Sequence, residues 1–196
     1  MFLRRLAGLT IAGVLTFSVW NGIASANELA APKTEKEAKL VKFEGKLIDL
    51  SKGWGEAQAC VVWETADASE CFRSEAQLEA HTAKINDEIN TGTRQVNGEA
   101  GTMAACSSYL RIYEHTSWGG RVLQFADRGV WQNLSGWGFS DETSSYRVGA
   151  CSANLAEHFN GSGLWYPGAT SAGSSSSCMC AGSTNWNDRV SSIRVN

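Results

Sequence analysis

The sequences YEHTSWGG (113–120) and AEHFNGSG (156–163) share a Glu-His pair and a closing glycine, and they lie 43 residues apart. Each is followed by a loop rich in acidic and hydroxyl side chains, SDETSSYRV (140–148) after the first and NDRVSSIRV (187–195) after the second. A repeat this short cannot bury its own apolar face, so the two copies are expected to pack on each other. The pattern predicts one domain with two matching halves and two matching loops.

Short apolar runs surround the repeat, and several of them alternate with polar residues. Residues 106–196 are rich in Gly, Ser, Trp and Tyr, with turn signals about every 8–12 residues, which is typical of an all-β sandwich. About 90 residues are enough for eight short strands. No helix longer than about one turn is expected there, because glycine and β-branched residues interrupt the helical period.

The first residues of the chain indicate export. Arg4 and Arg5 precede an apolar run (6–19), and the small residues 24–26 offer a cleavage site, so residues 1–26 are predicted to be a secretory signal peptide. The apolar run is too short to span a bilayer comfortably, so no membrane association is expected. Removal of the two arginines changes the formal charge from −3 to −5, which argues against nucleic acid as a partner. The predicted location is extracellular.

Between the signal peptide and the repeat, three segments differ in composition. Residues 27–45 are rich in Lys and Glu and are expected to form a flexible leader. Residues 46–89 are predicted to form a small α+β unit, with a hairpin and a helix that begins after Ser74 and carries a capping box. Residues 90–104 are polar and contain glycine, and they are interpreted as a linker to a domain over 105–196.

Six cysteines in an exported chain predict three disulfides. Cys60 and Cys71 lie at opposite ends of the predicted hairpin, so a local disulfide between them is expected. Two pairings stay open for the other four: 106–178 with 151–180, or 106–180 with 151–178. A local bond between Cys178 and Cys180 is disfavoured because it is expected to be strained.

The two halves of the repeat resemble a known family. Tyr113, Trp118 and Gly120 fit the pattern aromatic-x-x-x-x-aromatic-x-Gly, and NDRVSS (187–192) fits the pattern Asn/Asp-Asn/Asp-x-x-Ser/Thr-Ser. Together these resemble the two signatures of a βγ-crystallin Greek-key motif, over residues 106–196. The implied fold is mainly β: a two-Greek-key βγ-crystallin-like sandwich, preceded by the small disulfide-stapled α+β unit.

This resemblance implies weak calcium binding, with an affinity on the order of 10⁻⁴–10⁻³ M. In the family the two loops exchange ligands. The carbonyl of Glu142 would therefore act with the hydroxyl of Ser191, and the carbonyl of Arg189 would act with the hydroxyl of Ser144. The remaining implied ligands are Asp141, Asp188 and the carbonyls of Glu114 and Glu157. The competing interpretation is that these Asp and Ser side chains only cap turns by bonding the backbone.

Other functions compete with calcium binding. The streptomycete metalloprotease-inhibitor family has the same two-Greek-key fold and is also exported, which implies an inhibitory loop within 166–177. A cell-wall glycan-binding module is a further alternative, with Trp131, Trp137 and Trp186 near loops, and a secreted toxin of the same fold is another. The Glu-His pairs suggest zinc only weakly, since no Cys/His spacing of a zinc site accompanies them. No catalytic residues are predicted, because no nucleophile elbow or paired carboxylate signal is present.

Overall fold

The computed structural model describes residues 39–96, 109–180 and 184–196. The predicted signal peptide, residues 27–38 of the predicted leader, residues 97–104 of the predicted linker and Cys106 lie outside the described residues. All described residues belong to one compact unit. Among them, no helix has the length and apolar character needed to cross a membrane.

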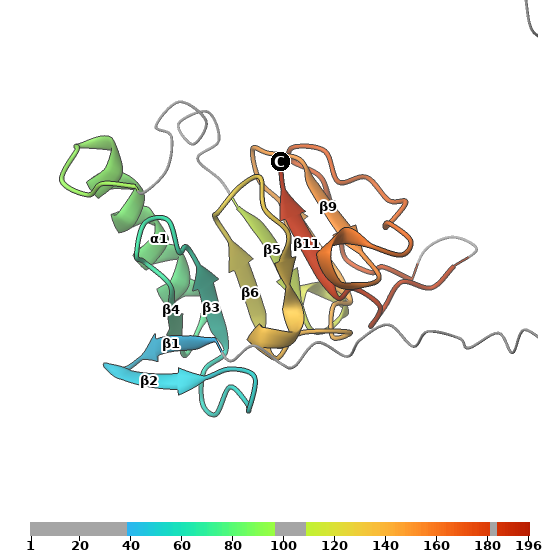
Figure 1. Ribbon diagram of the computed structural model, residues 1–196, viewed down its shortest axis with the longest axis horizontal. Helices are drawn as coiled ribbons and strands as arrows, with labels where there is room; N and C mark the ends of the chain where they lie inside the picture. The colour runs from blue at the N-terminus through green and yellow to red at the C-terminus, as the bar shows by residue number, and fades with distance from the viewer. Residues whose placement is uncertain (1–38, 97–108, 181–183) are drawn as a thin grey trace, which may run out of the picture. The chain divides into compact units, whose positions relative to one another are not determined.

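The described strands form two sheets (Figure 1). The larger sheet has the strand order β10-β8-β5-β6-β3-β4-β1-β2, and the smaller has the order β7-β11-β9. The strand bounds are β1 Leu40–Phe43, β2 Lys46–Asp49, β3 Ala59–Val62, β4 Glu70–Phe72, β5 Leu110–Tyr113, β6 Val122–Phe125, β7 Gln132–Asn133, β8 Ser145–Val148, β9 Ala153–Ala156, β10 Ser175–Ser176 and β11 Ser192–Val195. Three short 3₁₀ helices, η1 (Thr116–Trp118), η2 (Leu134–Trp137) and η3 (Phe159–Gly161), lie between them.

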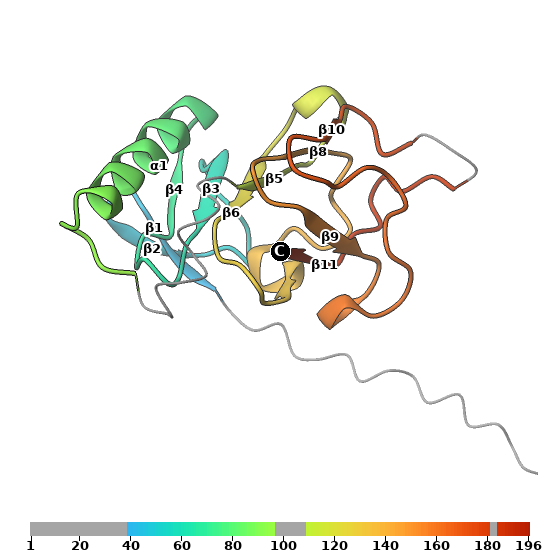
Figure 2. The ribbon, with the colours of Figure 1, turned by 90° about the horizontal axis from the view of Figure 1, so that it is seen from above.

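The two sequence repeats fold as two intertwined units. In the first repeat, β5, β6 and β8 lie in the larger sheet while β7 pairs with β11 of the smaller sheet. In the second repeat, β9 and β11 pair in the smaller sheet while β10 pairs with β8 of the larger one. Each repeat thus contributes a short strand to the sheet of the other. Figure 2 shows β10 of the second repeat beside β8. The predicted mainly β, two-Greek-key fold with a disulfide-stapled α+β part is confirmed.

The α+β part continues the larger sheet rather than standing beside it. Strand β3 pairs with β6 in parallel, with Cys60 opposite Leu123, and β3 also pairs with β4. Helix α1 (Glu75–Asn90) contacts β3 and β4. Its N-cap residue Ser74 accepts a hydrogen bond from the backbone N–H of Gln77, as predicted for a capping serine. All four residues of β3 are buried because this strand is covered on both faces.

The predicted leader ends earlier than expected. Residues Leu40–Phe43, which were assigned to it, form β1, which pairs with both β2 and β4. The side chain of Val41 is buried in the core, and this burial outweighs the polar composition of the segment around it.

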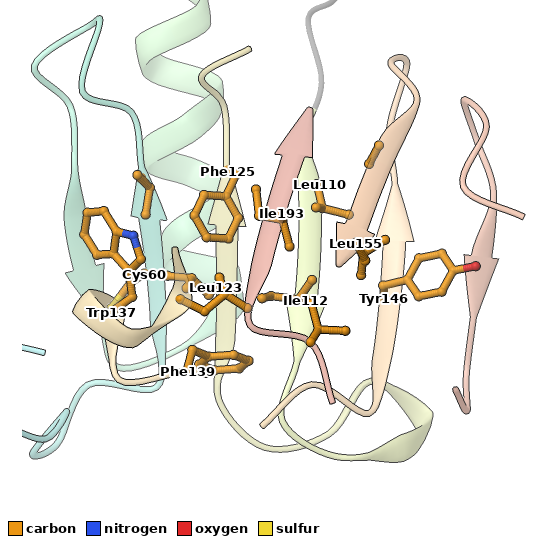
Figure 3. Packing of buried hydrophobic residues seen from close by; sticks show 14 of the residues in the cluster. Cys60, Leu110, Ile112, Leu123, Phe125, Trp137, Phe139, Tyr146, Leu155 and Ile193 are labelled. Carbon is orange, nitrogen blue, oxygen red and sulfur yellow. The ribbon is translucent and has the colours of Figure 1, made fainter. Parts of the chain in front are cut away.

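Two apolar clusters lie on opposite faces of the larger sheet. The first fills the space between the two sheets and includes Leu110, Ile112, Leu155 and Ile193 (Figure 3). The second lies under α1 and includes Leu78, Ile85, Val61, Tyr113 and Val122. Neighbouring residues of β3 and β6 alternate between the clusters, as the two-residue period of a strand requires.

One predicted disulfide is present and another pairing is corrected. Cys60 and Cys71 are bonded across β3 and β4, as expected. Cys178 and Cys180 are bonded to each other, so both pairings that joined them to Cys106 and Cys151 are wrong. The chain turns at the buried Met179 and brings the two Cα atoms within 5.1 Å, a separation that a disulfide spans normally. Cys151 is disulfide-bonded as well.

Candidate metal centre

The two predicted loops lie against each other in a symmetric arrangement. Asp141 and Asp188 both adopt left-handed backbone conformations, with φ of 58° and 56°. The backbone N–H of Asp141 donates to the carbonyl of Val190 (2.9 Å), and that of Asp188 donates to the carbonyl of Thr143 (3.0 Å). Each loop therefore donates one backbone hydrogen bond to the loop of the other repeat and accepts one from it.

The serine and aspartate side chains pair across the repeats. Ser191 Oγ donates to Asp141 Oδ1 at 2.8 Å, and Ser144 Oγ donates to Asp188 Oδ1 at 3.0 Å. Both serines are only 6% exposed, whereas both aspartates are exposed to solvent. The structure thus brings together four of the residues named from the sequence, as two pairs that each join a carboxylate of one repeat to a hydroxyl of the other.

Several backbone carbonyls in and near the two loops accept no hydrogen bond from the described residues. Among the described residues, none donates a hydrogen bond to the carbonyl oxygen of Glu142 or Arg189, the residues that follow the two aspartates. The same holds, within the described ranges, for the carbonyls of Glu114 and Glu157. Exposed carbonyl, carboxylate and hydroxyl oxygens are the ligands that Ca²⁺ takes.

An open pocket of about 590 Å³ lies over part of this arrangement. Its lining residues are Glu114, His115, Thr116, Asp141, Glu142, Ser144 and Asp188. Residues of the first hairpin thus share one hollow with both aspartates. Asp188 and Ser144, which pair with each other, both line this pocket, whereas Arg189, Glu157 and Ser191 do not.

Two arginines neutralise the glutamates that flank the loops. Arg121 contacts Glu114 through two nitrogens, with Nε to Oε2 at 3.0 Å and Nη2 to Oε1 at 2.8 Å, and this pairing lowers the pKa of Glu114. Arg189 Nη2 contacts Glu157 Oε1 at 2.5 Å, and this contact lowers the pKa of Glu157. The side chains of both glutamates are therefore engaged, which leaves their backbone carbonyls as the oxygens available for a cation.

The side chain of Arg189 is directed to these contacts rather than to the loop oxygens. Its guanidinium carbon lies 4.8 Å from the ring centroid of Trp186, and its Nη1 donates to the carbonyl of Asn185 at 3.3 Å. Its charge is thus balanced by Glu157 and by the face of an aromatic ring. The backbone carbonyl of Arg189 can serve a cation although the residue itself is basic.

No group of three or more His, Cys, Asp or Glu side chains suited to a metal ion occurs in the described part of the chain. The duplicated histidines therefore join no zinc-type cluster there. The side-chain oxygens that meet at the loops are instead one carboxylate and one hydroxyl in each of the two pairs. Such hard oxygen donors match calcium rather than zinc.

Sequence reasoning missed Arg121 and its surroundings. The guanidinium carbon of Arg121 lies 5.2 Å from the ring centroid of Trp54 and 5.4 Å from that of Phe139, and Nη2 lies 3.3 Å from Glu142 Oε2. The repeat offset of 43 places Leu164, a neutral residue, at the equivalent position of the second copy. This difference between Arg121 and Leu164 is the sequence signal for a specific role of Arg121, because a charge present in only one copy of a repeat often has a specific partner.

Two of the three tryptophans considered for glycan stacking are not accessible. Trp137 and Trp186 are each 2% exposed and belong to the core between the sheets. Trp131 is partly exposed and packs against Trp165. Burial of the first two follows from their place between two apolar sheets, where a large ring contributes most to the core.

The comparisons with known proteins identify a likeness of structure. No family model matches the chain, and no curated protein matches it. Solved βγ-crystallin domains match 45% of this chain: one from Ciona intestinalis (20% identity, 100% of that chain, TM-score 0.38), one from an archaeon (22%, 96%, 0.34) and one from Clostridium beijerinckii (18%, 97%, 0.36). These matches are likenesses of fold alone, over this part of the chain.

Proposed function

We propose that this protein is a secreted, non-enzymatic calcium-binding protein whose two Greek keys hold the ion at their paired loops. The observation that carries the proposal is the reciprocal pairing of Ser191 with Asp141 and of Ser144 with Asp188. Turn capping alone needs bonds to the backbone of the same loop, whereas these serines bond side chains of the other repeat. The pairing places oxygen donors from distant segments next to each other.

Each site would take one aspartate carboxylate, one serine hydroxyl and backbone carbonyls. The first would use Asp141, Ser191 and the carbonyl of Glu142, and the second would use Asp188, Ser144 and the carbonyl of Arg189. The carbonyls of Glu114 and Glu157 are further ligands of the two sites. One carboxylate per ion is few for calcium, so the affinity is expected to be on the order of 10⁻⁴–10⁻³ M, as in extracellular modules.

Export is part of the same proposal. Disulfides persist mainly in oxidising compartments, and the described residues contain the Cys60–Cys71 and Cys178–Cys180 bonds. Extracellular calcium is millimolar in many settings, so a weak site is occupied there. Because the ion would bind only the folded state, it would raise the stability of the protein by mass action.

Calorimetric titration of the mature chain with calcium tests the proposal. We expect two weak sites, loss of one in Asp141→Asn and of the other in Asp188→Asn, and loss of both in the double variant. Glu142→Gln is the matched control, since it removes a carboxylate from the same loop and keeps the backbone carbonyl. Binding that is absent in the wild type at about 10 mM calcium, or that falls equally in the control, contradicts the proposal.

Protease inhibition is a second candidate, supported by the loop at 166–177. Several hydrogen bonds hold this exposed segment, with Tyr146 Oη donating to the Ala169 carbonyl at 2.6 Å and the N–H of Gly173 donating to the Gly149 carbonyl at 2.7 Å. A loop fixed in this way loses little entropy when it enters a protease cleft. Inhibition of thermolysin by the wild type, abolished when residues 169–173 are replaced by a Gly-Ser sequence of equal length, tests this candidate.

A further inference from the structure

Exposed apolar side chains occur on two segments, one from each repeat, that meet at the rings of Trp131 and Trp165. Val130 is 51% exposed, Leu164 is 60% exposed and Trp165 is 52% exposed. Of the large apolar side chains that are exposed in the described residues, only Leu40 and Leu47 lie elsewhere, on β1 and β2. Trp131 packs against Trp165, so these four residues, 130, 131, 164 and 165, define an aromatic patch. Residues 130 and 131 are neighbours in the chain, as are residues 164 and 165, and the ring contact joins the two pairs. A group of exposed apolar side chains marks a binding site more often than a lone exposed residue does.

The two tryptophan rings are fixed before any ligand arrives. Their centroids lie 5.5 Å apart with the planes inclined by 58°, and Trp165 Nε1 donates to the carbonyl of Gly161 at 2.7 Å. A Cβ at Gly161 would lie 2.2 Å from the Trp131 ring, so that ring rests directly on the glycine backbone. Gly161 has φ of +75°, which a side chain would also strain. The local backbone therefore positions both rings, and little entropy remains to be lost on binding.

Neutral polar groups border the patch. Asn133 Nδ2 donates to Asn160 Oδ1 at 2.9 Å, and the backbone N–H of Asn160 donates to Asn133 Oδ1 at 2.8 Å. Within the described residues, nothing accepts a hydrogen bond from the side-chain NH₂ of the exposed Asn160. A fixed amide next to a fixed indole pair supplies both a hydrogen-bond donor and an apolar surface to one ligand.

The chain around the patch carries almost no charge. Residues 129–140 and 159–187 contain no Asp, Glu, Lys or Arg. The nearest carboxylate along the second hairpin belongs to Glu157, and it is paired with Arg189. Arg128, two residues before Val130, donates from Nε to the carbonyl of Asn196 at 3.0 Å. With so few charges along these segments, the surface suits a neutral ligand better than an ionic one.

We propose that the aromatic patch binds a neutral glycan, with pyranose rings stacked on Trp165 and Trp131 and a hydroxyl accepting from Asn160. The C–H groups on one face of a pyranose carry partial positive charge and pack on the negative face of an indole, while its equatorial hydroxyls stay free for amides and water. A stable protein partner would need a larger buried surface than these four side chains provide. This inference is independent of calcium, because none of the four residues is among the oxygen donors of the loops.

Titration of the mature chain with cellotetraose, chitotetraose and mannotetraose, in the presence of EDTA, tests the inference by calorimetry. Binding of at least one oligosaccharide is expected, and the one that binds identifies the hexose. Trp165→Ala should weaken its association constant by about tenfold, the loss that one aromatic contact and its buried area represent. Trp165→Tyr should keep most of the binding because it keeps an aromatic face.

Leu164→Ala is the matched control, since it removes a more exposed apolar side chain without removing a ring. Its effect should be less than about twofold. In ¹H–¹⁵N spectra, the indole N–H signals of Trp131 and Trp165 should move on binding, and that of the buried Trp137 should stay. No binding of any of the three sugars at about 10 mM overturns the inference. Equal losses in Leu164→Ala and Trp165→Ala, or a concentration-dependent dimer that only Trp165→Ala abolishes, also overturn it.

Discussion

The guanidinium of Arg121 lies over the indole of Trp54, with its central carbon 5.2 Å from the ring centroid. Trp54 belongs to the α+β part of the chain and Arg121 to the first Greek key, and the same guanidinium holds Glu114 beside the candidate calcium loops. Trp54 Nε1 also donates to the carbonyl of Trp137 at 2.8 Å. A side chain outside the two repeats thus supports the first repeat, and at the equivalent position to Arg121 the second repeat has the neutral Leu164.

Substitution of Trp54 should separate the packing of its ring from its hydrogen bond. Trp54→Ala should lower the free energy of unfolding by about 3–5 kcal/mol, because the buried ring is lost and a cavity remains. Trp54→Phe keeps most of the ring but leaves the Trp137 carbonyl without its donor, so a loss of about 1–3 kcal/mol is expected. Urea unfolding measures the free energy of unfolding of both variants. Equal losses in Trp54→Ala and Trp54→Phe would show that the packing of the ring and its hydrogen bond do not contribute separately.

Gly138 should be the least replaceable glycine of the first repeat. Its φ is +62°, and a Cβ there would lie 2.3 Å from the carbonyl oxygen of Leu50, which is backbone and cannot move aside cheaply. Gly173 also has a positive φ, +76°, but a Cβ there meets no atom within 4 Å. Gly173→Ala should therefore cost only the left-handed conformation, about 1–2 kcal/mol.

Gly138→Ala should cost at least about 2 kcal/mol more than Gly173→Ala, because the loop at Leu50 must be displaced as well. Thermal and urea unfolding of both variants measure the difference. If the two alanine variants are equally stable, the close approach of the two backbones contributes nothing.

The repeat was predictable from the sequence because its signals are local. Paired Asp and Ser residues, a capping box after Ser74 and alternating strands each follow from neighbours a few residues apart. The Ser74 half of the capping box is confirmed, while the side chain of Gln77 accepts from the N–H of Arg73 rather than of Ser74. The two loops meet, as the duplicated pattern predicts. Whether these loops bind calcium stays a prediction.

Contacts between distant segments were not predictable in the same way. The parallel pairing of β3 with β6 depends on packing on both faces of β3, and no short-range pattern states which strand will be its neighbour. The apolar run CVVW (60–63) did carry a hint, because a strand that is apolar at every position is usually covered on both faces. The Cys178–Cys180 bond was rejected on expected strain, whereas the turn at Met179 makes it accessible.

The two described disulfides should contribute differently to stability. Cys60–Cys71 closes a loop with a sequence separation of 11, and Cys178–Cys180 one with a separation of 2. Chain entropy gives about 3 kcal/mol for the first and about 2 kcal/mol for the second, and the buried sulfurs of the first add to its share. Alanine replacement of each pair, followed by urea unfolding, should show the larger loss for the first pair, and the reverse order would contradict the prediction.

Glu114 should make stability depend on pH in the acid range. Its pairing with Arg121 lowers its pKa in the folded protein below the ordinary value of 4.5. A carboxyl group whose pKa is lower in the folded state stabilises that state fully above its ordinary pKa, and this contribution disappears as the pH falls through the lowered value. The wild type should therefore lose stability as the pH drops below about 4.5, partly through this group.

Glu114→Gln removes this contribution and tests it directly. The variant should be less stable than the wild type at pH 7, and the two urea midpoints should converge as the pH falls, because the wild-type carboxylate becomes protonated and then resembles the amide. Glu157→Gln should change the pH profile in the same direction, since Arg189 lowers the pKa of Glu157 in the second repeat. The prediction is contradicted if the pH profiles of Glu114→Gln and the wild type stay parallel from pH 7 into the acid range. Arg121 would then contact a neutral partner as strongly as a charged one. The charge of Glu114 would have no part in holding Arg121 against Trp54.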